Sequence, residues 1–103
     1  MKRVFICSRY AGQIEKNVGT AKRLCRKAVE QGLAPLAPHL HYTRFLDDEK
    51  SEERNAGIAC GLKFMEVCDL VWVFVGDGIS NGMRREIDHA KRLGKLVLEI
   101  EEV

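Results

Sequence analysis

The sequence has little of several features that would point to particular classes of protein. Its 103 residues include only two prolines and one tryptophan, and no apolar run approaches the roughly 20 residues of a membrane-spanning helix. The net charge is only +2 and long runs of like charge are missing, so neither nucleic acid nor a membrane is an expected partner. Met1-Lys2-Arg3 leads into an apolar run that is too short for a signal peptide, and we expect a cytoplasmic protein.

The cysteines lack the spacing of a metal site or a redox pair. None of the four belongs to a CxxC pair, and none has a histidine at ligand spacing. All of them lie in apolar patterns, which is typical of reduced, buried thiols. The residues concerned are Cys7, Cys25, Cys60 and Cys68. We expect no metal and no cofactor.

Length and hydrophobic pattern predict one α/β domain over residues 1–103. The expected strands are residues 4–7, a short edge strand within 33–38, 70–75 and 96–100. The expected helices are residues 18–31 with Asn17 as N-cap, 51–67 with Ser51 as N-cap, and 82–93. This alternation predicts a three-layer, Rossmann-like or flavodoxin-like open parallel sheet with strand order 2-1-3-4 and helices on both faces.

The second expected helix carries two apolar rows instead of one. The first row is Ala56, Cys60, Phe64 and Val67, and the second is Ile58, Leu62 and Met65. A helix that is apolar on two sides must bury both of them. We therefore expect this helix to join copies of the chain into a homo-oligomer.

A loop rich in rings and acids follows the edge strand, over residues 39–48. It suggests the wall of a pocket at the carboxyl end of the sheet. For His39 and Tyr42, packing of the loop on its own surface is an equal alternative.

Residues 69–90 hold the features around which the rest of the chain is organised. A buried strand leads into two glycine-containing breaks, 76–78 and 80–82, and then into a helix that carries Glu86. With strand order 2-1-3-4, the loop of residues 8–12 faces these breaks across the switch-point crevice, where α/β proteins bind ligands. The free N–H groups at the start of that helix suit a phosphate or a sugar hydroxyl.

The residues at this crevice favour chemistry on a glycosidic bond. The glycines form neither G-x-G-x-x-G after the first strand nor G-x-x-x-x-G-K-[ST], which argues against a dinucleotide oxidoreductase and a P-loop NTPase. Glu86 can attack an anomeric carbon and form a covalent glycosyl intermediate, although a solvated helix carboxylate is the alternative. The departing base also needs a proton or a hydrogen bond. Asp77 and His39 are better placed for that than Asp69, because Asp69 precedes its strand on the far side.

These segments resemble the nucleoside 2-deoxyribosyltransferase-like superfamily, and more closely its small phage and bacterial branch, whose members mostly lack an assigned activity. The resemblance covers nearly the whole chain and rests on residues 5–8, 10–12, 37–40, 68–74, 79–83, 86–87, 90 and 94–95. It implies that Glu86 is the nucleophile that carries the deoxyribosyl group, and that residues 80–82 hold a 5′-phosphate. It also implies that the loop 8–12 lines the base and sugar site, and that Asp69 lies near the base.

The chain departs from the superfamily pattern at several points. Ser80 stands where relatives often carry an acid, Arg9 stands where small members have proline, and the transferases' additional C-terminal segment is missing. We expect an N-glycosidic hydrolase or deoxyribosyltransferase acting on a nucleoside or nucleoside 5′-monophosphate. The alternatives are a nucleotide-binding or sequestering module without turnover, and an interaction protein without a ligand.

The expected site residues fall into two groups. The candidate catalytic residues are Glu86, Asp77 and Asp69. The candidate substrate-binding residues are Ser8, Arg9, Tyr10, Gly12, His39, Gly76, Ser80, Asn81 and Gly82.

Overall fold

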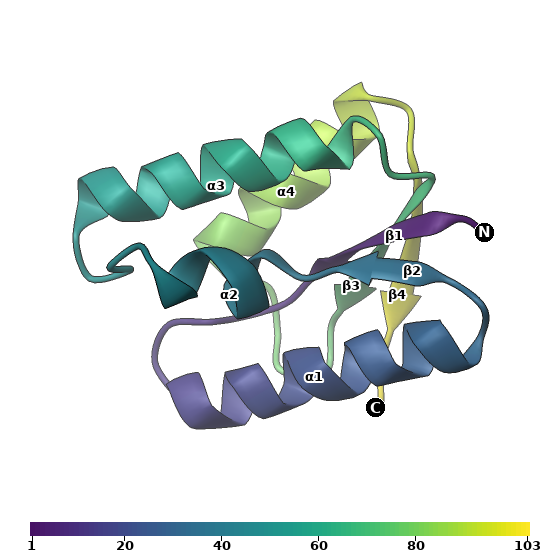
Figure 1. Ribbon diagram of the computed structural model, residues 1–103, viewed down its shortest axis with the longest axis horizontal. Coiled ribbons are helices and arrows are strands. Elements are labelled where there is room, and N and C mark those ends of the chain that lie inside the picture. Colours follow the sequence, from purple (N-terminus) through teal and green to yellow (C-terminus); the bar gives the residue numbers. More distant parts are fainter.

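The computed structural model describes all 103 residues and places four parallel strands in one sheet (Figure 1). The strands are β1 (Arg3–Cys7), β2 (Ala34–Leu36), β3 (Leu70–Phe74) and β4 (Leu96–Ile100). Their order across the sheet is β2-β1-β3-β4, and every neighbouring pair is parallel. This confirms the expected order 2-1-3-4, with the proline-containing strand at the edge, where a missing backbone donor is tolerated.

Helices cover both faces of the sheet, which confirms the three-layer α/β architecture. Helix α1 (Ile14–Glu30) lies on one face, and α3 (Ser51–Met65) and α4 (Asn81–Arg92) lie on the other (Figure 1). Between β2 and α3 the chain forms a short helix α2 (Pro38–His41) and a 3-10 turn η1 (Tyr42–Arg44). None of these helices is long and apolar enough to cross a membrane.

The central strand β1 supplies both halves of the core, because successive side chains of a strand point to opposite faces. Val4 and Ile6 pack with residues of α1, whereas Phe5 and Cys7 pack with residues of α3 and α4. All four side chains are buried, as expected for a central parallel strand. Cys7, the last residue of β1, therefore lies on the same side of the sheet as α4.

The start of α1 differs from the sequence-based expectation. The helix begins at Ile14 after Gln13, so Asn17 lies within its first turns and is not its N-cap. The buried side-chain amide of Asn17 donates to the carbonyls of Tyr10 (2.9 Å) and Ala11 (3.3 Å). The first turn is exposed and carries no apolar periodicity, so the pattern of hydrophobic residues does not mark it.

Two further expectations about local structure were wrong. Helix α3 has Lys50, not Ser51, as its N-cap, and no side chain caps it. The segment after β2 is not an open loop, because Pro38 starts α2. Proline suits the first turn of a helix, where its missing N–H has no intrahelical partner to lose.

Only one of the two apolar rows of α3 is buried by the rest of the chain. Met65 is fully buried and Ile58 and Leu62 are half-buried. In the other row, Phe64 is 52% exposed and Val67, just past the helix end, is 57% exposed. This second row has nothing over it within one copy of the chain.

Replacing Asn17 by alanine should lower the free energy of unfolding by about 1–2 kcal/mol, because two loop carbonyls lose their donor. Urea denaturation followed by circular dichroism measures this change. Lys22→Ala, an exposed position of the same helix, is the matched control and should change stability by less than about 0.5 kcal/mol. Equal stability of the two variants would show that the amide does not secure the loop.

Candidate functional site

The turn between β3 and α4 presents a helix N-terminus at the carboxyl edge of the sheet. Ser80 is the N-cap of α4, and its hydroxyl accepts a hydrogen bond from the N–H of Met83 at 3.2 Å. Before it, Gly78 has φ of +82°, a conformation that favours glycine. The remaining free N–H groups of the first turn of α4 are thus available for an anion at this edge.

A cleft of about 330 Å³ opens beside this turn. Its walls come from the β1–α1 loop, the α2 region, α3 and the first turns of α4. The lining residues are Arg9, Tyr10, Ala11, His39, Asp48, Arg54, Ile58, Ser80, Asn81, Gly82, Met83, Arg85 and Glu86. The volume is in the range of small-molecule sites.

Glu86 is the most unusual side chain of this cleft, since it is a carboxyl group that is only 3% exposed. Burial raises the pKa of Glu86 from 4.5 to about 8, while a hydrogen bond with the Cys7 thiol and the charge of Arg85 act in the opposite direction. The carboxyl group is therefore mostly protonated at neutral pH, whereas the same residue in the unfolded chain is ionised.

Cys7 lies behind Glu86 and does not line the cleft. Its Sγ donates to the carbonyl oxygen of Met83 at 3.8 Å, and its contact with the Glu86 carboxyl group contributes to the pKa shifts of both residues. Burial, followed by the negative charge of Glu86, raises the pKa of the Cys7 thiol well above its ordinary value. The thiol stays protonated and supports Glu86 as a neutral neighbour.

Tyr10 and His39 form an aromatic wall of the cleft. Their rings are stacked, with centroids 5.1 Å apart and planes inclined by 23°. Burial lowers the pKa of His39, although the nearby charge of Asp48 and a hydrogen bond with the backbone of Ser8 oppose this shift. His39 is therefore a neutral imidazole at pH 7, able to offer a hydrogen bond without carrying a charge.

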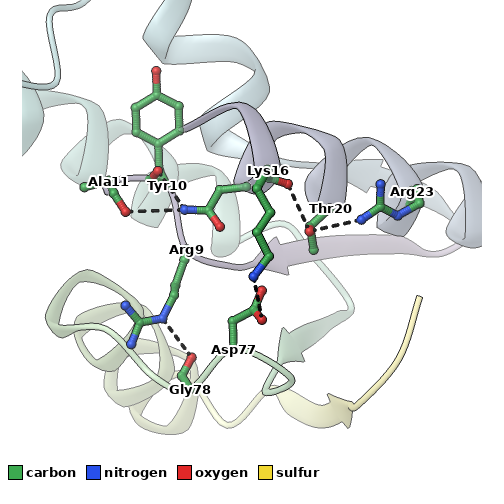
Figure 2. A network of polar contacts seen from close by, with 9 residues as sticks. Arg9, Tyr10, Ala11, Lys16, Thr20, Arg23, Asp77 and Gly78 are labelled. Atoms are coloured by element: carbon green, nitrogen blue, oxygen red, sulfur yellow. Dashed lines mark hydrogen bonds and ion pairs between the residues drawn. The ribbon is translucent and has the colours of Figure 1, made fainter. Parts of the chain in front are cut away.

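Three guanidinium groups from different elements line the same cleft. Arg9 Nε donates to the carbonyl of Gly78 at 3.3 Å (Figure 2), and Arg85 Nη1 donates to Asn55 Oδ1 at 3.2 Å. Arg54 is the third. None of these three arginines takes part in any of the four ion pairs of the structure. The only acids that line the cleft are Asp48 and Glu86, and Glu86 is mostly neutral at pH 7. The cleft is therefore suited to an anionic ligand.

Most of the residues that the sequence singled out line this cleft. They are Arg9, Tyr10, His39, Ser80, Asn81, Gly82 and Glu86. Ser8 is buried and meets the cleft only through its backbone contact with His39. Gly76 lies in the turn, where an added Cβ would come within 2.7 Å of the Glu101 carbonyl oxygen, so its role there is to allow close packing.

The other expected site residues lie elsewhere. Gly12 and Asp77 line a neighbouring pocket, where Asp77 pairs with Lys16 at 3.3 Å (Figure 2). Asp69 accepts a hydrogen bond from the backbone N–H of Arg3 at 2.7 Å, at the opposite edge of the sheet. That edge holds the amino ends of the strands and is remote from the cleft.

Sequence reasoning missed Arg54, Arg85 and Asp48 as residues of the cleft. They come from α3, α4 and the segment before α3, and no spacing in the sequence shows that these segments converge. Tyr42, for which a pocket wall was one alternative, is buried and packs edge-on against His41 and Phe45. It also lines a small hollow of about 20 Å³ next to the cleft, together with His39 and Glu86. No group of three or more histidine, cysteine or acidic side chains lies close enough together to hold a metal ion.

A family model described as "Domain of unknown function (DUF7768)" matches residues 2–100. The chain belongs to this family. No curated protein matches the DUF7768 chain by sequence. The family description assigns no activity.

Several solved structures share the fold at low sequence identity. A 2-deoxyribosyltransferase from Bacillus psychrosaccharolyticus superposes with a TM-score of 0.69 and 19% identity, over 94% of this chain and 70% of that one. A CMP N-glycosidase from Clostridium botulinum superposes with a TM-score of 0.62 and 21% identity, over 95% of this chain and 70% of that one. A 2-deoxyribosyltransferase from Leishmania mexicana superposes with a TM-score of 0.56 and 18% identity, over 97% of this chain and 64% of that one. The chain has the nucleoside 2-deoxyribosyltransferase-like fold, as its sequence resemblance implied.

Replacing Glu86 by glutamine should stabilise the protein in a pH-dependent way. In the folded protein the Glu86 carboxyl group keeps its proton up to about pH 8, whereas in the unfolded chain it loses the proton near pH 4.5. The free energy of unfolding therefore falls as the pH rises from about 4.5 to about 8. Glutamine cannot ionise and avoids this loss, which is about 3 kcal/mol at pH 7. Thermal unfolding at pH 4, 7 and 9 measures the difference.

The matched control is Asp88→Asn, which changes an exposed carboxylate on the same helix. Its melting temperature should follow that of the wild type at each pH. If Glu86→Gln raised the melting temperature as much at pH 4 as at pH 7, ionisation of Glu86 would not be the cause of the gain in stability.

Proposed function

We propose that this protein cleaves the N-glycosidic bond of a nucleoside 5′-monophosphate, with Glu86 as the nucleophile. The observation that carries the proposal is a buried carboxyl group in a cleft whose three arginines have no acidic ion-pair partner. The fold shared with a CMP N-glycosidase and with 2-deoxyribosyltransferases supports the same class of reaction. The arginines favour a phosphorylated substrate over a bare nucleoside.

In the proposed reaction, an ionised Glu86 oxygen attacks C1′ of the sugar. The C1′–O bond forms as the C1′–N bond breaks, and the electron pair of that bond leaves with the base, which takes up a proton. Water then attacks C1′ and the C1′–O bond to Glu86 breaks, which restores the Glu86 carboxylate; the proton that the water loses balances the one that the base has taken up. If a second base replaces water in this step, the same intermediate gives transfer instead of hydrolysis.

The surrounding residues have distinct roles in this proposal. The first turn of α4 with Ser80, Asn81 and Gly82, together with Arg9, holds the 5′-phosphate. The aromatic wall formed by Tyr10 and His39 offers a flat surface to the base.

A nucleotide-binding module without turnover is the second candidate, and the protonation of Glu86 favours it. A carboxyl group with a pKa of about 8 is mostly uncharged at neutral pH and can donate a hydrogen bond to a bound ligand. Such a group is a poor nucleophile until it loses its proton. The enzyme is therefore expected to act on the fraction of molecules in which Glu86 is ionised.

Release of free base from nucleoside 5′-monophosphates, followed by chromatography, separates the two candidates. For an enzyme, kcat/KM should rise about tenfold per pH unit up to about pH 8 and then level off, since the free enzyme must have Glu86 ionised. Glu86→Gln should lower base release by about 10³-fold or more, while the ligand still binds.

Asp88→Asn, with the carboxylate removed from an exposed site of the same helix, should retain wild-type turnover. Binding of monophosphates without base release at any pH from 6 to 9 would contradict the enzymatic proposal. It would support the binding module instead.

We also propose that the exposed row of α3 joins two copies of the chain. The row is continuous over Ala56, Cys60, Phe64 and Val67, all of them exposed. Within one copy the row remains in contact with water, and a second copy of the same helix would cover it with the same kind of surface.

Phe64→Glu should convert an oligomer into a monomer, because it places a charge in the middle of this row. Sedimentation velocity measures the mass in solution. Phe45→Glu is the matched control, since Phe45 is 63% exposed but lies outside α3. A monomeric wild type, or dissociation by both variants alike, would contradict the proposal.

A further inference from the structure

A second pocket of about 260 Å³ adjoins the cleft on the side of α1. Its lining residues are Arg9, Ala11, Gly12, Gln13, Lys16, Asn17 and Asp77. Two of these residues, Arg9 and Ala11, also line the cleft that contains Glu86. Arg9 therefore stands at the boundary between the two spaces and can contact a ligand that occupies both.

The second pocket is polar, and both of its cationic groups are accessible. Figure 2 shows Arg9 directed to Gly78 and Lys16 directed to Asp77, so both cationic side chains point toward the turn that follows β3. The Lys16 side chain is 54% exposed and that of Asp77 is 29% exposed. Of the seven lining residues only Ala11 is apolar, so the pocket suits a charged or hydroxyl-rich group and not a base.

We propose that the ligand continues beyond its first phosphate, past Arg9, and places a second phosphate group in this pocket near Lys16. The substrate class is then a nucleoside carrying a diphosphate chain, either a nucleoside 5′-diphosphate or a nucleotide joined through a pyrophosphate. This inference rests on the proposed function, since it assumes that the nucleoside and first phosphate occupy the cleft. Beyond the proposed function, the inference adds a second phosphate group to the ligand, which the cleft alone does not require.

Asp77 sets the selectivity of the second pocket in this arrangement. Its carboxylate holds the Lys16 amine at 3.3 Å, and a second phosphate has to share that amine with it. Removing the negative charge of Asp77 leaves Lys16 free for the ligand. Asp77→Asn is therefore expected to strengthen binding of a diphosphate, which is the opposite of what loss of a catalytic acid would do.

Titration calorimetry with the 5′-mono- and 5′-diphosphates of adenosine and cytidine and their 2′-deoxy forms tests the inference. The wild type should bind the diphosphate of the preferred nucleoside about tenfold more tightly than its monophosphate, the gain of one charge-assisted contact. Lys16→Gln should remove most of this preference and Asp77→Asn should increase it. Lys22→Gln, an exposed position of the same helix outside both pockets, should leave it unchanged.

Equal affinity for mono- and diphosphates in the wild type, or a diphosphate preference that survives Lys16→Gln, would overturn the inference. Lys16 is exposed, so circular dichroism should show a folded variant, and Asp77→Asn provides a second test with the opposite sign. Base release is measured on the same samples. A preference for diphosphates without base release would support the second phosphate site and contradict the proposed catalysis. Base release without this preference would support catalysis and contradict the second phosphate site.

Discussion

The burial of one carboxyl group is the constraint on which the candidate site depends. Glu86 occupies a position of α4 that faces the sheet, among the buried residues Met83, Ile87 and Ala90. An ionised carboxylate is costly there, so burial keeps the group protonated until about pH 8, even though the hydrogen bond with the Cys7 thiol favours the ionised form. A fold optimised for stability alone would place an apolar or amide side chain at this position.

The sheet and the cap of α4 together fix where that carboxyl group lies. Cys7 ends β1, β1 and β3 are adjacent, and the chain leaving β3 turns into α4 with Ser80 as its cap. Glu86 therefore lies within two turns of a helix that starts at the carboxyl edge of the sheet, beside the free N–H groups of that helix. The topology thus brings the buried acid and the Ser80–Gly82 turn to one cleft.

The sequence predicts the sheet well because a parallel strand that is buried on both faces leaves a continuous apolar run, as in residues 70–75. It predicts helix ends less well, because an exposed first turn such as that at Ile14 carries no periodic signal, and an asparagine such as Asn17 can serve a loop as readily as a cap. Glu86 and the turn at Ser80 can be found from the sequence, since both lie on one continuous segment. Arg54 and Arg85 cannot, because only the packing of α3 against α4 brings them to the cleft, and Asp48 reaches it from the segment before α3.

The unpaired arginines of the cleft have a consequence for the protein in solution. Three guanidinium groups without carboxylate partners make this part of the surface positive, so small anions such as phosphate and chloride are attracted to it. An anionic ligand in the proposed site would compete with these ions. Its apparent affinity would then fall as the concentration of phosphate or salt rises.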